Sequence, residues 1–428
     1  MFANGFVAVF LGLMLVGVPI AFALAAGGIS YFVITDKLFF LQNLAQKLIG
    51  GVNQFPLLAI PLFVLAGELM NVGGITKRLV SFAHVCVGHW RGGLAQVGIA
   101  ANVMLAGLSG SAAADAAVLG GMLVPAMEKD GYTRPSACSV IAASAIIGPI
   151  IPPSIICVLY AFVMQISVIG LFMACVVPGL LLGAGLMLVT RLIARRKHFP
   201  EPTKAASFRE VLRALRDAIL PLLTPVIILR GTVSGMFTAT EAAAVVVFYS
   251  LLLSLFVYRS ITPRELPHIL YRAMLSSAVI LFIVATAFVF AWAVTMSGLP
   301  SKLAVFSAEL TSNKYIFLFC INIALLIVGM FLDAGPAVLI MAPILAPAAM
   351  QFGVDPTHFA IIMCINLCVG LVTPPMGLVL FVTAAVGKVS VVEICREMVP
   401  YWILHGIIVL LITYVPVISL GLPRMFGV

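Results

Sequence analysis

Two sets of oxygen-bearing residues recur in this sequence at a spacing of 222 residues. Each set pairs a short segment rich in glycine with a later segment that ends in Pro-Pro. Hard cations such as sodium prefer oxygen ligands, including hydroxyl, carboxylate and amide oxygens and opened backbone carbonyls. The sequence therefore predicts two sodium sites, with the candidate ligands Ser109, Gly110, Ser111, Ser144, Gly148, Pro149, Gly329, Asp333, Gly335, Asn366, Gly370 and Thr373.

The same spacing aligns residues that break helices, which indicates an internal duplication. The aligned breakers are Gly107 with Gly329, Pro125 with Pro347, Gly131 with Gly353, Gly148 with Gly370, and Pro152-Pro153 with Pro374-Pro375. Among the candidate ligands, Ser111 aligns with Asp333 and Ser144 with Asn366, while Thr373 aligns with Ile151, so oxygen ligands recur at two of these three paired positions. An alternative is that these small residues only let helices pack closely. Packing alone does not explain a duplicated Pro-Pro break.

Three acidic residues lie within or beside apolar segments, where ionisable groups are costly and usually functional. Asp115 follows the first glycine-rich break and is a candidate helix cap, because a carboxylate near a helix N-terminus is stabilised by about 0.3–1 kcal/mol. We interpret Glu68 and Glu241 as interhelical or subunit contacts. A role in proton coupling is the alternative for both.

The composition requires a membrane. Hydrophobic residues make up 63% of the 428 residues and charged residues only 9%, and several apolar runs exceed the roughly 20 residues that cross a bilayer. The net charge of +9 comes from basic residues in loops rather than from one basic face, so we exclude nucleic acid as a partner. Eight Lys and Arg residues lie between Arg191 and Arg216, which predicts a cytoplasmic segment.

The chain is expected to be an all-α integral membrane protein with a first repeat (1–195), a basic linker (196–216) and a second repeat (217–428). Residues 92–128 and 315–352 are each too long for one crossing and contain a central break, so each is predicted to be a re-entrant helical hairpin. Residues 134–165 and 357–387 are predicted broken helices. The remaining predicted segments are 5–34, 36–50, 55–72, 75–91 and 167–195, then 217–258, 262–275, 276–298, 300–313 and 400–421.

The crossing number of each repeat decides the topology: an odd number would invert one repeat relative to the other. Residues 217–258 hold either one long helix or two short ones. The short amphipathic stretches, such as 36–50, are expected to lie in the membrane interface.

Four helix breaks at membrane depth indicate function, because unsatisfied backbone is tolerated there only inside protein or beside a wet cavity. Paired broken helices in repeats place carbonyls around cations and helix N-termini toward anionic substrates. This pattern is typical of a secondary transporter. No GxSxG, HExxH or GxxxxGK[ST] motif is present, so neither a hydrolase nor ATP-driven transport is favoured.

Four runs resemble the large membrane subunit of tripartite ATP-independent periplasmic (TRAP) transporters, and the resemblance covers essentially the whole chain. The runs are 56–70, 109–111, 148–154 and 370–377. Two departures are Ala239, where family members often carry proline, and the position of Pro336 in the second hairpin tip.

The resemblance implies a sodium-driven importer of organic acids, such as sialic acid or C4-dicarboxylates, in the bacterial inner membrane. It also implies two partners, a periplasmic substrate-binding protein and a small four-helix membrane subunit. The implied fold is an elevator of the ion-transporter type, in which a domain of hairpins and broken helices slides against a scaffold. No cofactor is implied besides the sodium ion. The alternatives are a stand-alone ion-coupled carrier of dicarboxylates or citrate, and a channel.

Overall fold

The computed structural model describes residues 5–196, 199 and 205–427 of the chain. Residues 197–198 and 200–204 of the predicted linker therefore lie outside the described part. Before the linker the helices are α1 (Gly5–Leu15), α2 (Ile20–Ile34), η2 (Leu38–Asn43), α3 (Leu44–Val52), η3 (Phe55–Leu58), α4 (Ala59–Val72), α5 (Ile75–Val87), α6 (Gly93–Ser109), α7 (Ala112–Lys129), α8 (Arg134–Ala145), α9 (Ile155–Met164) and α10 (Val168–Arg196).

After the linker the chain is again helical. The helices are α11 (Phe208–Val233), α12 (Ala239–Leu252), the π-helical turn η4 (Leu253–Val257), α13 (Leu266–Ser297), α14 (Leu299–Leu310), α15 (Lys314–Phe331), α16 (Ala334–Gln351), α17 (Pro356–Gly370), α18 (Leu378–Gly387), α19 (Val391–Tyr414) and α20 (Val417–Phe426).

Seven helices of the described chain are long and apolar enough to cross a membrane. They are 55–72, α10, 239–257, α13, α15, α16 and α19. Large apolar side chains such as Leu188, Ile323 and Ile407 are exposed on these helices. Contiguous exposed apolar surface of this kind is expected where lipid replaces water. The predicted class, an all-helical protein with several membrane spans, is confirmed.

The order of the helices follows the 222-residue offset. The six helices from α5 to α10 begin within two residues of the positions that this offset predicts from α14 to α19. Helices α7 and α16 coincide at both ends, with α7 spanning Ala112–Lys129 and α16 spanning Ala334–Gln351. Each of the segments 92–128 and 315–352 therefore holds two helices joined by a short turn, α6 with α7 and α15 with α16, and their re-entrant insertion into the membrane stays a prediction.

Three predicted segments differ from the structure. Residues 5–34 form two helices instead of one, because Gly17 has φ +88° and Pro19 is extended, with ψ 138°. Residues 262–275 are not a separate amphipathic stretch, since α13 continues without a break to Ser297. The segment predicted as 400–421 begins earlier, at Val391, and a second helix follows Pro416.

Two further boundaries were left open or placed differently. The stretch 217–258 consists of two helical units, the end of α11 and then α12 with η4. Helix α11 begins at Phe208, inside the predicted linker, where Ser207 and Glu210 form a capping box. The regular helix therefore starts well before the predicted second repeat.

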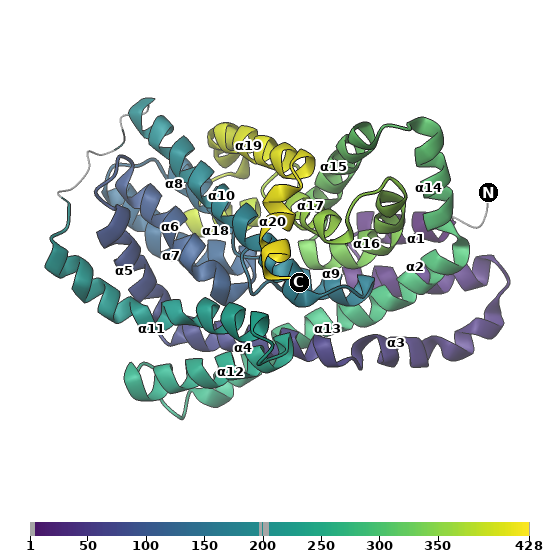
Figure 1. The fold of residues 1–428 in the computed structure, drawn as a ribbon, viewed down its shortest axis with the longest axis horizontal. Coiled ribbons are helices and arrows are strands. Elements are labelled where there is room, and N and C mark those ends of the chain that lie inside the picture. Colours follow the sequence, from purple (N-terminus) through teal and green to yellow (C-terminus); the bar gives the residue numbers. More distant parts are fainter. Residues whose placement is uncertain (1–4, 197–198, 200–204, 428) are drawn as a thin grey trace.

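The helices form two groups that meet at α13 and α4. Helix α13 runs along α2, α3 and α4, and it also contacts the hairpin helix α16. Figure 1 shows α3, α4, α12 and α13 along one edge, with α6, α8, α15, α17 and α19 on the other side. The two hairpins are interleaved with the other half of the chain, because α7 packs on α18 and α16 packs on α9. This interleaving brings both hairpin tips to the same place.

Candidate functional site

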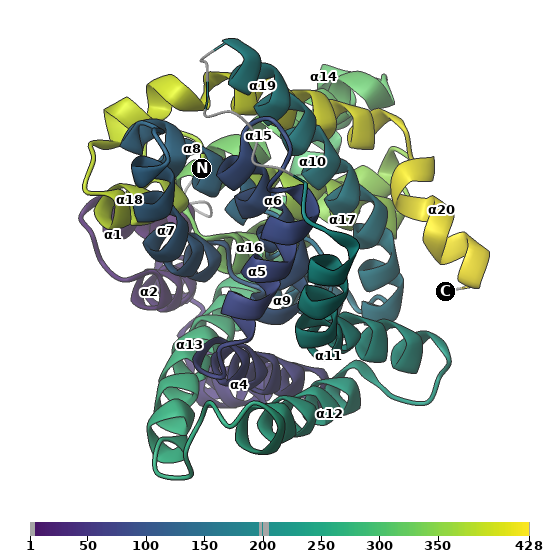
Figure 2. The ribbon, with the colours of Figure 1, turned by 90° about the vertical axis from the view of Figure 1, so that its left-hand side faces the viewer.

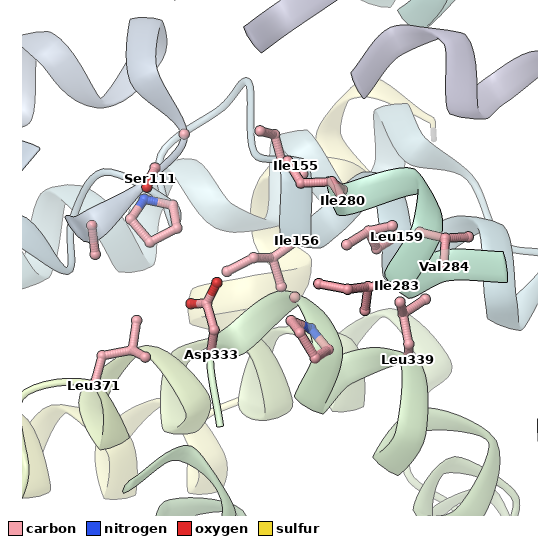
Figure 3. Close-up of a pocket in the computed structure, with 15 residues that line it drawn as sticks. Ser111, Ile155, Ile156, Leu159, Ile280, Ile283, Val284, Asp333, Leu339 and Leu371 are labelled. Atoms are coloured by element: carbon pink, nitrogen blue, oxygen red, sulfur yellow. The ribbon is translucent and has the colours of Figure 1, made fainter. Parts of the chain in front are cut away.

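A cavity of about 110 Å³ lies where the two hairpin tips meet α13. Gly110 and Ser111 come from the first tip, and Asp333 and Gly335 from the second. Figure 3 shows Ser111 and Asp333 on separate segments of the cavity wall, with isoleucines of α9 and α13 around them. The other lining residues are Ala112, Pro149, Ile155, Ile156, Leu159, Ile280, Ile283, Val284, Pro336, Leu339 and Leu371.

The first tip is a sharp turn built by its sequence. Gly110 ends α6 in the left-handed region at φ +61°, a conformation that costs glycine little. Ser111 is then the N-cap of α7, and its Oγ accepts a hydrogen bond from the Ala114 N–H at 3.4 Å. The side chain of the predicted ligand Ser109 lies outside the described part of the structure.

The second tip carries a charge at the equivalent position. Asp333 is the N-cap of α16, and its Oδ1 accepts a hydrogen bond from the Ala334 N–H at 2.8 Å. Figure 3 shows the carboxylate pointing into the cavity. Aspartate and serine are both strongly preferred N-caps. Each tip residue therefore stabilises the start of its helix in addition to lining the cavity.

Three helix N-termini converge on this cavity. The first residues of α7, α9 and α16 all line it, namely Ala112, Ile155 and Gly335 with their neighbours. A helix N-terminus carries about half a positive elementary charge and exposes N–H donors. The cavity can therefore hold an anionic group, while the Asp333 carboxylate and the backbone oxygens near it can hold a cation.

Ser144 and Asn366 are in buried hydrogen bonds outside the cavity wall. Asn102 donates to Ser144 Oγ at 2.6 Å, and Ser144 donates to the Val140 carbonyl at 2.9 Å. In the second half, Asn366 donates to Asn322 Oδ1 at 2.8 Å. These contacts tie the first helix of each hairpin, α6 or α15, to the helix that precedes the break, α8 or α17.

Asn102 and Asn322 were not predicted from the sequence. Both are nearly fully buried, and Asn322 also donates to Thr413 Oγ1 at 3.0 Å. An asparagine within an apolar helix could have indicated a contact between helices, because a buried amide needs a hydrogen-bond partner on a neighbouring helix. The sequence could not identify that partner, since the contact crosses between helices.

The break between α8 and α9 packs closely against the carboxylate of Asp115. A Cβ atom added to Gly148 would collide with Asp115 Oδ2, so only glycine allows this approach. Asp115 is nearly fully buried and lies one turn after the N-cap Ser111, so the predicted cap position belongs to Ser111. Ser154 donates to the Pro149 carbonyl and caps α9 by accepting from the Cys157 N–H.

The break between α17 and α18 brings two glycines together. A Cβ atom on Gly370 would collide with the backbone of Gly329, which shows that α15 and α17 touch here through glycine. Thr373 donates to the Val369 carbonyl at 2.8 Å and is half-buried. Close packing is evident at Gly329 and Gly370 and a local hydrogen bond at Thr373, while a role of the three residues in binding a cation stays a prediction.

Glu68 lies in a second cavity of about 210 Å³ beside the first. This cavity is also lined by Ser111 and Asp115, so Glu68 of α4 faces the first hairpin. Glu241 lies elsewhere, in the first turn of α12, where it accepts from the Thr238 N–H at 2.8 Å and closes a capping box. Contacts of either glutamate with another subunit stay predictions.

Comparison with known proteins decides the family. The family model described as "Tripartite ATP-independent periplasmic transporter, DctM component" matches residues 7–418. The chain belongs to this TRAP transporter family. It is 42% identical over 386 residues to the C4-dicarboxylate TRAP transporter large permease protein DctM of Pseudomonas aeruginosa, with 90% of each chain covered. It is also 38% identical over 416 residues to the sialic acid TRAP transporter large permease protein SiaM of Vibrio cholerae, with 97% of each covered.

The fold of this TRAP permease is similar to that of a solved membrane transporter. The YdaH transporter of Alcanivorax borkumensis superposes with a TM-score of 0.62 at 14% sequence identity, covering 91% of this chain and 87% of that one. At this identity the likeness concerns the fold alone. Membership of the TRAP transporter family makes the protein a transporter permease rather than an enzyme, as predicted.

Proposed function

We propose that this TRAP permease imports an organic acid by sodium-coupled secondary transport. The observation that carries the proposal is the convergence of both hairpin tips and three helix N-termini on one cavity. The N-termini favour the carboxylate of a solute, while Asp333 and nearby backbone oxygens favour a cation. Binding the cation and the solute side by side lets each stabilise the other.

The proposed solutes are organic acids of the kind that name its relatives. The relatives in Pseudomonas aeruginosa and Vibrio cholerae are named for C4-dicarboxylates and sialic acid, which are both carboxylates. The cavity wall offers few polar side chains besides Ser111 and Asp333. Recognition of the carboxylate is therefore proposed here, while the choice among acids would depend on the protein that delivers them.

The proposed mechanism is an elevator. Helix α13 belongs to the group formed with α2, α3 and α4, and it closes one side of the cavity. Movement of the hairpins along α13 would carry the tips and their ligands across the membrane. We propose that the halves are inverted, with the 196–216 linker in the cytoplasm, because this orientation satisfies the positive-inside tendency.

Two partners belong to the proposal: a periplasmic substrate-binding protein and a small membrane subunit with four helices. Membership of the tripartite family supports both partners. The proposed setting is the bacterial inner membrane, where a secreted binding protein can deliver the acid.

The test is uptake into proteoliposomes that hold the permease and the small subunit, with the binding protein and either sialic acid or a C4-dicarboxylate outside. We expect uptake with an inward sodium gradient and little uptake with potassium in its place. Omitting either partner is expected to abolish uptake. Undiminished sodium-driven uptake by the permease alone would instead show a stand-alone carrier, and saturable uptake without sodium would refute the coupling.

A further inference from the structure

A larger pocket, of about 790 Å³, lies between α8, α10 and α19. It shares no lining residue with the cavity at the hairpin tips. Figure 2 shows the three helices meeting at the same end of the molecule, and each contacts the other two. The pocket therefore belongs to a part of the protein that the proposed transport site does not use.

The mouth of this pocket is strongly basic. Arg195 and Arg196 come from the last turn of α10, and Arg396 comes from the start of α19, with Glu397 as the one carboxylate of the lining. Within the described residues the one ion pair joins Arg134 to Glu128, so no salt bridge neutralises these three arginines there. Guanidinium groups bind phosphate through two parallel hydrogen bonds.

Away from the arginines, the pocket is lined by hydroxyl-bearing and apolar side chains. Its floor includes the buried hydroxyl-bearing residues Ser136, Ser139 and Tyr401. Its sides are apolar and open outward, since Leu192 of α10 is 50% exposed and Ile403 of α19 is 61% exposed. Both helices are candidate membrane spans by length and composition, so these exposed side chains are expected to face hydrocarbon.

A ligand that fits this pocket needs a phosphate-like anion at one end and an apolar chain at the other. Basic pockets between transmembrane helices bind anionic lipid headgroups in this way. Arginines at helix ends also reach the interface without binding a particular lipid. Here, however, arginines of two helices share one pocket whose floor lies beneath them.

We propose that this pocket binds an anionic phospholipid. The phosphate lies among Arg195, Arg196 and Arg396, and an acyl chain follows the groove between Leu192 and Ile403. Each arginine near a membrane surface contributes about fivefold to the affinity for anionic lipid. The three together account for roughly a hundredfold preference over a zwitterionic lipid. The proposal does not depend on sodium coupling or on the identity of the transported acid.

The experiment is native mass spectrometry of the full chain in detergent, titrated with dioleoyl phosphatidylglycerol or dioleoyl phosphatidylcholine. The test variant is Arg195→Gln/Arg196→Gln/Arg396→Gln. The matched control is Arg209→Gln/Arg213→Gln/Arg216→Gln, which removes the same charge from exposed positions on α11 outside the pocket. We expect phosphatidylglycerol to bind the parent and the control alike, and the test variant at least tenfold more weakly.

Three results would overturn the proposal. Equal retention of phosphatidylcholine by the parent would show an apolar groove without headgroup selection. Equal weakening in the control variant would show a general effect of charge. Displacement of phosphatidylglycerol by millimolar glycerol phosphate would show a site for a soluble anion. If the triple variant does not purify, Arg396→Gln alone is expected to weaken binding about fivefold, and an unchanged affinity there would also contradict the proposal.

Discussion

Ser111 and Asp333 each combine a structural role with a proposed role in binding. Each caps the second helix of a hairpin, and each lines the cavity between the hairpin tips. A substitution there changes both helix stability and the cavity, so the two effects must be separated by the choice of replacement. Asparagine caps helices about as well as aspartate, which makes it the useful replacement for Asp333.

Asp333→Asn is expected to raise the half-saturating sodium concentration for uptake by more than a hundredfold. Asp333 is exposed to the open cavity in this structure. On the proposed mechanism a bound cation and the closed hairpins shield it from water, and losing one partner of such a buried charge costs about 3–5 kcal/mol, while the cap is retained. Ser111→Gly removes a neutral oxygen, worth about 1–3 kcal/mol, and keeps most of the cap, so its effect should be smaller, about five- to 150-fold. The measurement is initial uptake rate against sodium concentration in proteoliposomes with both partners.

Asp355→Asn is the matched control for this prediction. Asp355 caps α17 by accepting from the Thr357 N–H at 2.9 Å, and it lies outside the cavity lining. It should keep the parent's sodium dependence. If Asp333→Asn also keeps the parent's half-saturating sodium concentration and Hill slope, the tip residues are caps only, and the ion sites involve backbone alone.

Gly148→Ala is expected to lower the melting temperature, because the added methyl group would collide with the Asp115 carboxylate. Overpacking of this kind costs about 1–3 kcal/mol. Gly121→Ala is the matched control, since nothing lies within 4 Å of its added Cβ and alanine favours the α7 helix. The readout is thermal unfolding of monodisperse protein in detergent. Equal melting temperatures for the two variants would show that Asp115 moves aside at little cost.

At the level of helices, the sequence predicts the elements that repeat and misses some that do not. The two hairpins follow from the breaks at 107–111 and 333–336, and the two broken helices follow from the Pro-Pro pairs, because glycine and proline act locally on the backbone. The break at Gly17 and Pro19 carried the same signal but lies within an apolar run, which favoured one long helix. The sequence predicted a boundary between the segments 262–275 and 276–298. The structure has no break there, because α13 continues through residue 275.

The hydrogen-bonded side-chain pairs between helices could not be predicted from the sequence, for a different reason. Asn102 with Ser144 and Asn322 with Asn366 are 42 and 44 residues apart and meet only after the hairpins dock. A single sequence gives no information on such partners. The sequence therefore predicted the two residues of the hairpin tips that line the cavity, Ser111 and Asp333. Two other predicted ligands, Ser144 and Asn366, form hydrogen bonds between helices outside the cavity wall.

Labelling of introduced cysteines tests the proposed orientation of the helices. Ala205→Cys lies before α11 and avoids the N-cap Ser207, and Ser312→Cys lies at the start of the second hairpin; both positions are exposed. In a background without the native cysteines, a membrane-impermeant maleimide added to intact cells whose outer membrane is permeabilised should label Ser312→Cys but not Ala205→Cys. The opposite pattern would reverse the orientation, and labelling of both would refute the inverted arrangement.

The whole molecule consists of two groups of helices that contact each other through α13 and α4. On one side α13 lies with α2, α3 and α4, and on the other the hairpins are interleaved with the broken helices of both halves. The interleaving of α7 with α18 and α16 with α9 makes the second group a single packed unit. Because the cavity lies at the contact between the groups, relative movement of the groups would expose it to one side of the membrane and then the other.

A cross-link between the two groups tests this account most directly. Ile283 of α13 and Leu339 of α16 line the same cavity, so Ile283→Cys/Leu339→Cys in a background without native cysteines can be joined by an oxidant or a short bifunctional maleimide. We predict that the cross-link abolishes sodium-driven uptake in proteoliposomes, that reduction of the disulfide restores it, and that each single variant transports before and after oxidation. Full uptake by protein shown to be completely cross-linked would contradict the account, because the hairpins would then transport without moving along α13.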